Sequence, residues 1–211
     1  MIMASEVKFR IVVPGKIFIT KAMNEDIFTR YMRGDFMVYQ SDFAYYDTPD
    51  WDLAENGYLL RVCTSNGSNA ATLRTGIVDQ AEMPGLYTGN GWLSYFESPE
   101  TVVEDFLRRG AFRRFGELAK RGKLGVVFTT HRTRRRNNLY LGDHTVVDLC
   151  LDDGEICVDG KTERAMQMSL TLSYGDIDIF KNYCQQVLEE FALSPDLTTM
   201  TEKALRMLRS R

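Results

Sequence analysis

The pattern of polar and apolar residues predicts an α+β protein with a mainly antiparallel sheet. Three observations carry this prediction: many short alternating segments, four helical patterns, and turn residues between them. Strand-like segments occupy residues 6–13, 36–46, 58–64, 70–75, 92–97, 126–136, 139–141, 145–151, 155–158 and 166–173. Helical patterns occupy residues 17–32, 98–120 with a break near Gly110, 176–191 and 199–209.

The first strand carries charge on one face and apolar groups on the other. Glu6, Lys8 and Arg10 alternate with apolar residues, so the three charged side chains share one side of the strand. An ordinary barrel or sandwich buries its apolar face inside. The inverse arrangement suits a barrel that encloses a polar interior and has helices on its outside.

Length and composition narrow the class of protein. The chain has 211 residues with 44% hydrophobic and 26% charged residues, which predicts one soluble globular domain over residues 1–211. A net charge of -3 argues against a nucleic acid duplex or a membrane bound through overall charge. No stretch resembles a signal peptide or a membrane span, so we expect a cytoplasmic protein. The four cysteines form no CxxC pair, which leaves no zinc motif.

Short motifs follow one another along nearly the whole chain. Their order resembles that in the CYTH or triphosphate tunnel family, which includes inorganic triphosphatases, thiamine triphosphatases and class IV adenylate cyclases. The segment Tyr45-Tyr46-Asp47-Thr48-Pro49-Asp50, followed by Leu53, Gly57 and Leu60-Arg61, is the most specific match. The others are Glu6-Val7-Lys8, Thr72-Leu73-Arg74, Phe128-Thr129-Thr130 with Arg134, residues 147–154 ending in Asp152, residues 170–176, and Lys203-Ala204-Leu205-Arg206.

The resemblance implies a closed antiparallel eight-stranded β-barrel with helices packed outside and a tunnel that holds phosphates. Basic side chains in such a tunnel grip phosphate oxygens. Motif matches and strand parity assign this role to Lys8, Arg10, Arg61, Arg74, Arg132, Arg134, Arg136 and Lys203. The family's carboxylates hold one or two divalent metals, here Mg or Mn on Glu6, Asp148 and Asp152. Lys8, Arg74 and Asp152 would be the catalytic residues.

The acidic side of the family pattern is eroded in this chain. Ala4 replaces the first glutamate of the opening motif, and Cys63 replaces an arginine. The strand that usually presents alternating glutamates carries Gln167, Ser169 and Thr171 instead. Of another acidic segment only Glu97 survives. A tunnel with many cations and few carboxylates favours anion binding over metal-dependent hydrolysis.

Three functions remain open on this basis. The leading hypothesis is a module that binds a triphosphate, polyphosphate or nucleotide in a basic tunnel, with weak or absent hydrolysis. The alternative is an active Mg- or Mn-dependent triphosphatase that acts on inorganic or organic triphosphates. The third is an interaction domain that has lost its ligand. Dimers are common among domains of this kind, so a homodimer also stays open.

Overall fold

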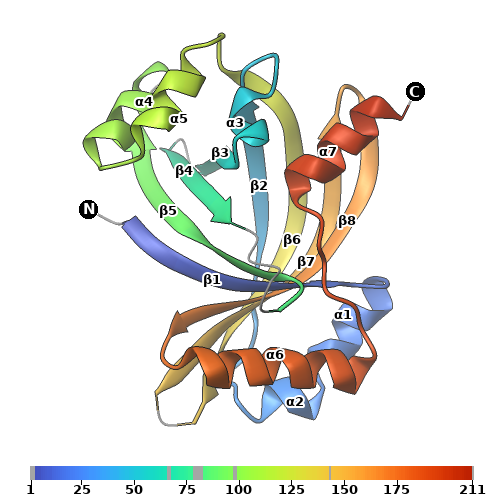
Figure 1. Ribbon diagram of the computed structural model, residues 1–211. Coiled ribbons are helices and arrows are strands. Elements are labelled where there is room, and N and C mark those ends of the chain that lie inside the picture. The colour runs from blue at the N-terminus through green and yellow to red at the C-terminus, as the bar shows by residue number, and fades with distance from the viewer. Residues whose placement is uncertain (1–2, 66–67, 78–82, 97–98, 143, 211) are drawn as a thin grey trace.

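The computed structural model describes residues 3–65, 68–77, 83–96, 99–142 and 144–210. Its eight described strands pair antiparallel and close into a barrel in the order β1-β5-β4-β3-β2-β6-β7-β8 (Figure 1). The predicted α+β class and closed eight-stranded barrel are confirmed. The strands are β1 (Met3–Val12), β2 (Met37–Asp47), β3 (Tyr58–Ser65), β4 (Ser68–Ile77), β5 (Leu86–Phe96), β6 (Gly125–Leu141), β7 (Thr145–Val158) and β8 (Lys161–Tyr174).

Two strands each join two of the predicted segments. The segments 126–136 and 139–141 are one strand, β6, and the segments 145–151 and 155–158 are one strand, β7. The sequence Asp152-Asp153-Gly154 is typical of a turn, but here it continues the strand. A Cβ on Gly154 would lie 2.7 Å from the Arg132 Cα and would overlap the His131 carbonyl. The glycine therefore permits a close approach of β6 and β7 rather than a turn.

The observed helices differ in part from the predicted ones. The single helix expected over residues 17–32 is two helices, α1 (Lys16–Ala22) and α2 (Asp26–Thr29). Between them the Asn24 side chain donates to the Thr20 carbonyl at 3.0 Å and competes with further helical pairing. The predicted break near Gly110 separates α4 (Pro99–Arg108) from α5 (Arg113–Ala119). The others are α3 (Asp52–Glu55), which was not predicted, α6 (Ile177–Phe191) and α7 (Met200–Arg209).

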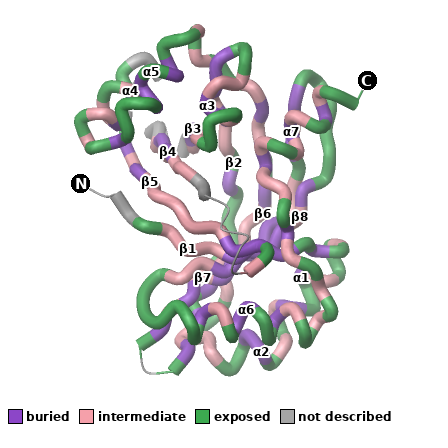
Figure 2. The backbone as a smooth tube through the Cα atoms, in the orientation of Figure 1, coloured by how far each residue is buried: buried purple, intermediate pink, exposed green. Residues whose placement is uncertain are grey.

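Helices cover two parts of the outer barrel surface. Beneath α1, α2 and α6, the outward side chains Phe9 and Ile11 of β1 are fully buried with residues of β7 and β8. Figure 2 shows buried backbone where these strands run beside the three helices. A second apolar cluster lies under α4 and α5 and includes Leu73 and Trp92. The inverted pattern of β1 is thus explained, because its apolar face is buried outside the barrel. None of the helices in the described ranges combines the length and apolarity that a membrane span requires.

Helix α7 occupies a different position from the other helices. Its Ala204 and Met207 pack in one cluster with Tyr45, Phe128 and Ile156. Tyr45 pairs with both Phe128 and Arg61, so these three side chains share one face of the sheet. This face is opposite to that of Leu60 and Val62, which are buried in the cluster under α4 and α5. Helix α7 therefore covers part of the inner face of the barrel, not its outside.

Candidate functional site

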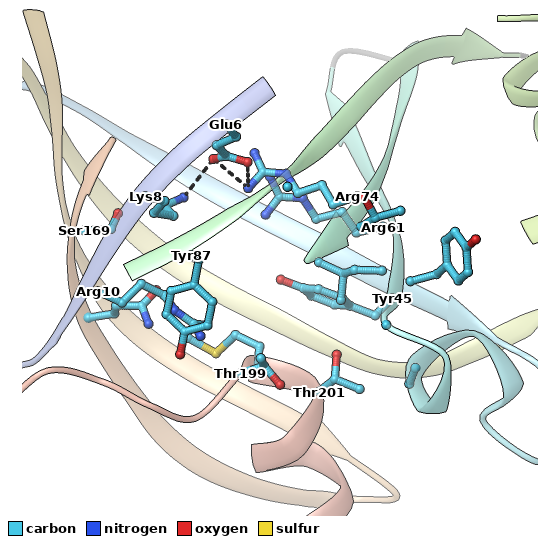
Figure 3. A pocket seen from close by; sticks show the side chains of 18 of the residues that line it. Glu6, Lys8, Arg10, Tyr45, Arg61, Arg74, Tyr87, Ser169, Thr199 and Thr201 are labelled. Atoms are coloured by element: carbon cyan, nitrogen blue, oxygen red, sulfur yellow. Dashed lines mark hydrogen bonds and ion pairs between the residues drawn. The ribbon is translucent and has the colours of Figure 1, made fainter. Parts of the chain in front are cut away.

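A cavity of about 220 Å³ lies in the barrel interior and is strongly basic. Strand alternation sends every second side chain inward, and long basic residues occupy these positions on neighbouring strands. Six of the eight predicted phosphate-binding residues line the cavity: Lys8, Arg10, Arg61, Arg74, Arg132 and Arg134. Figure 3 shows several of them converging from β1, β3 and β4.

Asp152 pairs with two of these arginines. The Arg134 Nε and Nη2 donate to its two carboxylate oxygens at 2.7 and 2.6 Å, and the Arg132 Nη1 donates at 3.2 Å. Only 1% of Asp152 is exposed. Burial raises the pKa of the carboxyl, but the Arg134 and Arg132 guanidinium groups outweigh this effect and lower it. Asp152 is therefore an ionised anchor for the two arginines.

Glu6 pairs with the other basic residues of its neighbourhood. Its carboxylate lies 2.9 Å from the Arg74 Nη1 and 3.4 Å from the Lys8 Nζ (Figure 3). Burial raises the pKa of Glu6, but the charges of Lys8 and Arg74 outweigh this effect and hold the pKa below its usual value. Burial and the charge of Arg74 lower the pKa of Lys8 to about 8. Lys8 is thus protonated at neutral pH and titrates just above it.

Two arginines of the cavity lack an acidic partner. Within the described residues, Arg10 and Arg61 form no ion pair with a carboxylate; each guanidinium stacks on a ring, at 3.5 Å from the Tyr87 centroid and 4.3 Å from that of Phe43. Burial and the nearby Arg74 lower the pKa of Arg61 to about 10. Buried nitrogens of several cavity arginines have no hydrogen-bond partner among the residues that the structure describes: the Nε and Nη2 of Arg10 and the Nε of Arg61, Arg74 and Arg132.

Two predicted phosphate-binding residues lie outside this cavity. Arg136 donates to Asp148 at 2.7 Å and is 42% exposed. Lys203 of α7 donates to the buried Asp196 at 2.7 Å. Both cations are engaged by a carboxylate that the motif comparison did not match to them. Glu97 lies outside the described residues.

The three predicted metal ligands do not come together. Glu6 faces Lys8 and Arg74, whereas Asp148 and Asp152 face arginines of β6. In the described part of the chain no group of three His, Cys, Asp or Glu side chains could hold a metal ion. Guanidinium groups engage both oxygens of Asp152 and one oxygen of Asp148, which a hard cation would need. The residues present therefore do not fit a metal held by the protein alone.

The cavity includes residues that the sequence prediction missed. Tyr45 and Tyr87 supply aromatic walls, and Thr199 and Thr201 come from the start of α7. Burial raises the pKa of Tyr45, but the charges of Arg132 and Arg61 outweigh it and lower the value to about 8. Tyr45 pairs with Arg61 across β2 and β3, so the two side chains share one face. In the sequence, the position of Tyr45 in the matched motif could have identified it as a lining residue, but no matched motif contains Thr199 or Thr201.

A second cavity of about 290 Å³ adjoins the first and shares Glu6 and Arg74 with it. It lies where β1 and β8 separate, since the pairing of these strands ends at Val7 and Leu172. Its remaining lining is uncharged and includes Ser5. The Glu6–Arg74 ion pair thus stands between the basic cavity and an uncharged opening in the barrel wall.

Comparisons place this architecture among known structures. No family model matches the chain, and no curated protein sequence matches it. A Bacillus halodurans protein provisionally described as an adenylate cyclase is 17% identical over 94% of this chain and 96% of its own, with a TM-score of 0.54. A Hippeastrum protein, provisionally described as an adenylyl cyclase and reported to have a dominant triphosphatase activity, is 13% identical over 97% and 94%, again at 0.54. The chain has the triphosphate tunnel fold.

A third structure with this fold is a Pyrococcus horikoshii protein, 17% identical over 96% of this chain and 99% of its own, with a TM-score of 0.54. The three matched chains are covered almost completely, so the triphosphate tunnel fold extends over nearly the whole chain. The basic cavity is the interior of this tunnel.

Proposed function

We propose that the protein binds a linear phosphate chain, as a triphosphate, a polyphosphate or a nucleotide, with weak or absent hydrolysis. The unpaired buried nitrogens of Arg10, Arg61, Arg74 and Arg132 are the observation that carries this proposal. A buried donor without an acceptor costs about 1–3 kcal/mol, and more when it is charged. Phosphate oxygens would satisfy these donors through charge-assisted hydrogen bonds.

The charge balance of the tunnel supports a polyanionic ligand. Six cationic side chains line the cavity, and two carboxylates, Glu6 and Asp152, face them, which leaves four positive charges unbalanced. Like charges that line one small cavity repel one another strongly where water is excluded. A phosphate chain carries several negative charges and would relieve this repulsion without a metal.

Tripolyphosphate in metal-free buffer at pH 7 should bind with a Kd in the micromolar range or below. Several charge-assisted hydrogen bonds, each contributing about 1.5–3 kcal/mol, act together in the tunnel. Isothermal titration calorimetry measures the affinity. The Lys8→Ala/Arg61→Ala variant, which removes two cations from the cavity, is the control and should bind tripolyphosphate more weakly. No heat from the parent at high micromolar protein would contradict the proposal and favour an interaction domain without a ligand.

The same titration should depend on pH in one direction. Because the pKa of Lys8 is about 8, this side chain carries its charge at pH 7. Above that value binding must take up a proton at Lys8, so the affinity should fall as the pH rises. Tyr45, whose pKa is also about 8, titrates in the same range, so the Lys8→Met variant is the control. An equal pH dependence of the affinity in the parent and in this variant between pH 7 and 9 would exclude Lys8 from the phosphate contacts.

A triphosphatase is the second candidate. The observation that favours it is the carboxylate of Glu6, which borders both cavities, and the similar Hippeastrum protein is reported to have this activity. Since Asp148 and Asp152 are paired with arginines, we expect no more phosphate release from tripolyphosphate with Mg or Mn than with a chelator. Metal-dependent phosphate release that disappears in Glu6→Gln would contradict this expectation and favour a triphosphatase over a binding module.

A further inference from the structure

The N-terminus of α7 opens onto the basic cavity. Thr199, Met200 and Thr201 line it, and Figure 3 shows Thr199 and Thr201 on the same side of the cavity as Arg10 and Tyr87. The rest of α7 packs on the apolar part of the inner face of the barrel. A chain of phosphates that follows β1 from Glu6 past Lys8 to Arg10 would therefore meet the start of this helix.

The first turn of α7 leaves two backbone donors without an acceptor. Thr199 is the N-cap: its side chain accepts from the Glu202 N–H, and the Glu202 carboxylate accepts from the Thr199 N–H at 2.6 Å. The hydrogen bonds of the described residues include none from the N–H groups of Met200 and Thr201. Free N–H groups and the positive end of the helix dipole together favour an anion at this position.

Arg10 supplies an independent sign of a ligand at the same place. It is only 8% exposed, and both its Nε and its Nη2 lack a partner. Its guanidinium is stacked 3.5 Å above the Tyr87 ring, and the Tyr87 hydroxyl donates to the Asp196 carbonyl at 2.8 Å. Asp196 lies just before α7, so the support of Arg10 and the entry to the helix are connected.

The carboxylates near this position are already engaged. Asp196 accepts from Lys203 at 2.7 Å and from Gln167 at 3.0 Å. Glu202 is held by the N-cap of its own helix. Neither carboxylate is therefore directed at the unpaired donors.

We propose that Arg10 and the N-terminus of α7 form a subsite for the terminal phosphate group of a linear phosphate chain. The tunnel would then hold chain ends and not internal segments, because α7 stands across the path of a longer chain. This inference rests on the proposed phosphate-chain binding and adds which part of the chain is recognised.

Linear polyphosphate of defined length, long enough to span many protein molecules, tests the inference on the parent protein. Sedimentation velocity at saturating protein counts the molecules bound to each chain. We expect no more than two, one at each end. A polyphosphate whose two ends are blocked as esters should not bind, and cyclic trimetaphosphate should also fail to bind.

A variant series tests the named groups. Arg10→Met should weaken tripolyphosphate binding at least tenfold, and Met200→Pro, which removes one N–H while keeping a residue suited to the first helical position, should weaken it by several-fold. Arg206→Met is the matched control, because the Arg206 side chain on α7 is 63% exposed, and it should leave the affinity for tripolyphosphate unchanged.

The outcomes separate the two proposals. Many protein molecules on each long chain, with tripolyphosphate still bound, would overturn end recognition and leave phosphate-chain binding intact. Equal affinity for blocked and free ends would have the same meaning. No binding of tripolyphosphate to the parent would overturn both proposals.

Discussion

Asp152→Asn should lower the free energy of unfolding by about 3–5 kcal/mol, the cost of breaking a buried ion pair from one side. The substitution keeps the shape of the side chain but removes the charge that Arg132 and Arg134 share. Both guanidinium groups would then stay buried beside Lys8 without a counterion. Urea unfolding followed by circular dichroism measures the loss.

Asp148→Asn is the matched control for this variant. Asp148 lies on the same strand and also pairs with an arginine of β6, but Arg136 is 42% exposed. A partly solvated pair contributes about 0–1 kcal/mol, so the control should lose little. Equal losses in the two variants would show that Asp152 has no special role as an anchor.

The contribution of Asp152 should also depend on pH with a definite sign. Its folded pKa lies below the usual 3.8 because of the paired arginines. A carboxyl with a lowered folded pKa stabilises the protein at pH values above the unfolded pKa, and this contribution is lost as the pH falls toward the folded value. The difference between the parent and Asp152→Asn should therefore be full at pH 7 and shrink below about pH 4.

Arg61→Met should change ligand affinity and stability in opposite directions. Arg61 is a half-buried cation with no carboxylate partner in the described residues, and desolvation of its guanidinium together with the neighbouring Arg74 lowers its pKa to about 10. Removing it should weaken tripolyphosphate binding about 100-fold, or about 2.8 kcal/mol, through the loss of charge-assisted hydrogen bonds. The free protein should become about 1 kcal/mol more stable, since a half-buried cation without a counterion is removed from among the like charges of Arg74, Arg132 and Arg134.

Calorimetry and thermal unfolding of the free protein measure the two effects separately. Arg113→Met is the control, because Arg113 is 94% exposed on α5, outside the barrel, and should change stability by less than about 0.5 kcal/mol. A variant at Arg61 that lost both stability and affinity would indicate a structural role. Unchanged affinity would remove Arg61 from the binding site.

The sequence by itself determined the class of fold and most of the tunnel lining. The alternation of Glu6, Lys8 and Arg10 with apolar residues predicts a strand with one charged and one apolar face, and the structure buries Phe9 and Ile11 under helices outside the barrel. The closed barrel itself was implied by the resemblance of the motifs. Strand periodicity is a local property, so it predicts which side chains share a face. Six of the eight predicted basic residues accordingly line one cavity.

Only the tertiary structure decided which charges are free and which are paired. The resemblance places Asp152 inside the barrel, and the antiparallel register puts it opposite Arg134, with which it pairs. Within the described ranges it belongs to no group of three His, Cys, Asp or Glu side chains that could hold a metal ion. Likewise, Glu6 meets Arg74, 68 positions further along the chain, only because β1 and β4 both pair with β5. Partners separated by many residues depend on strand register and helix packing, and no local pattern contains that information.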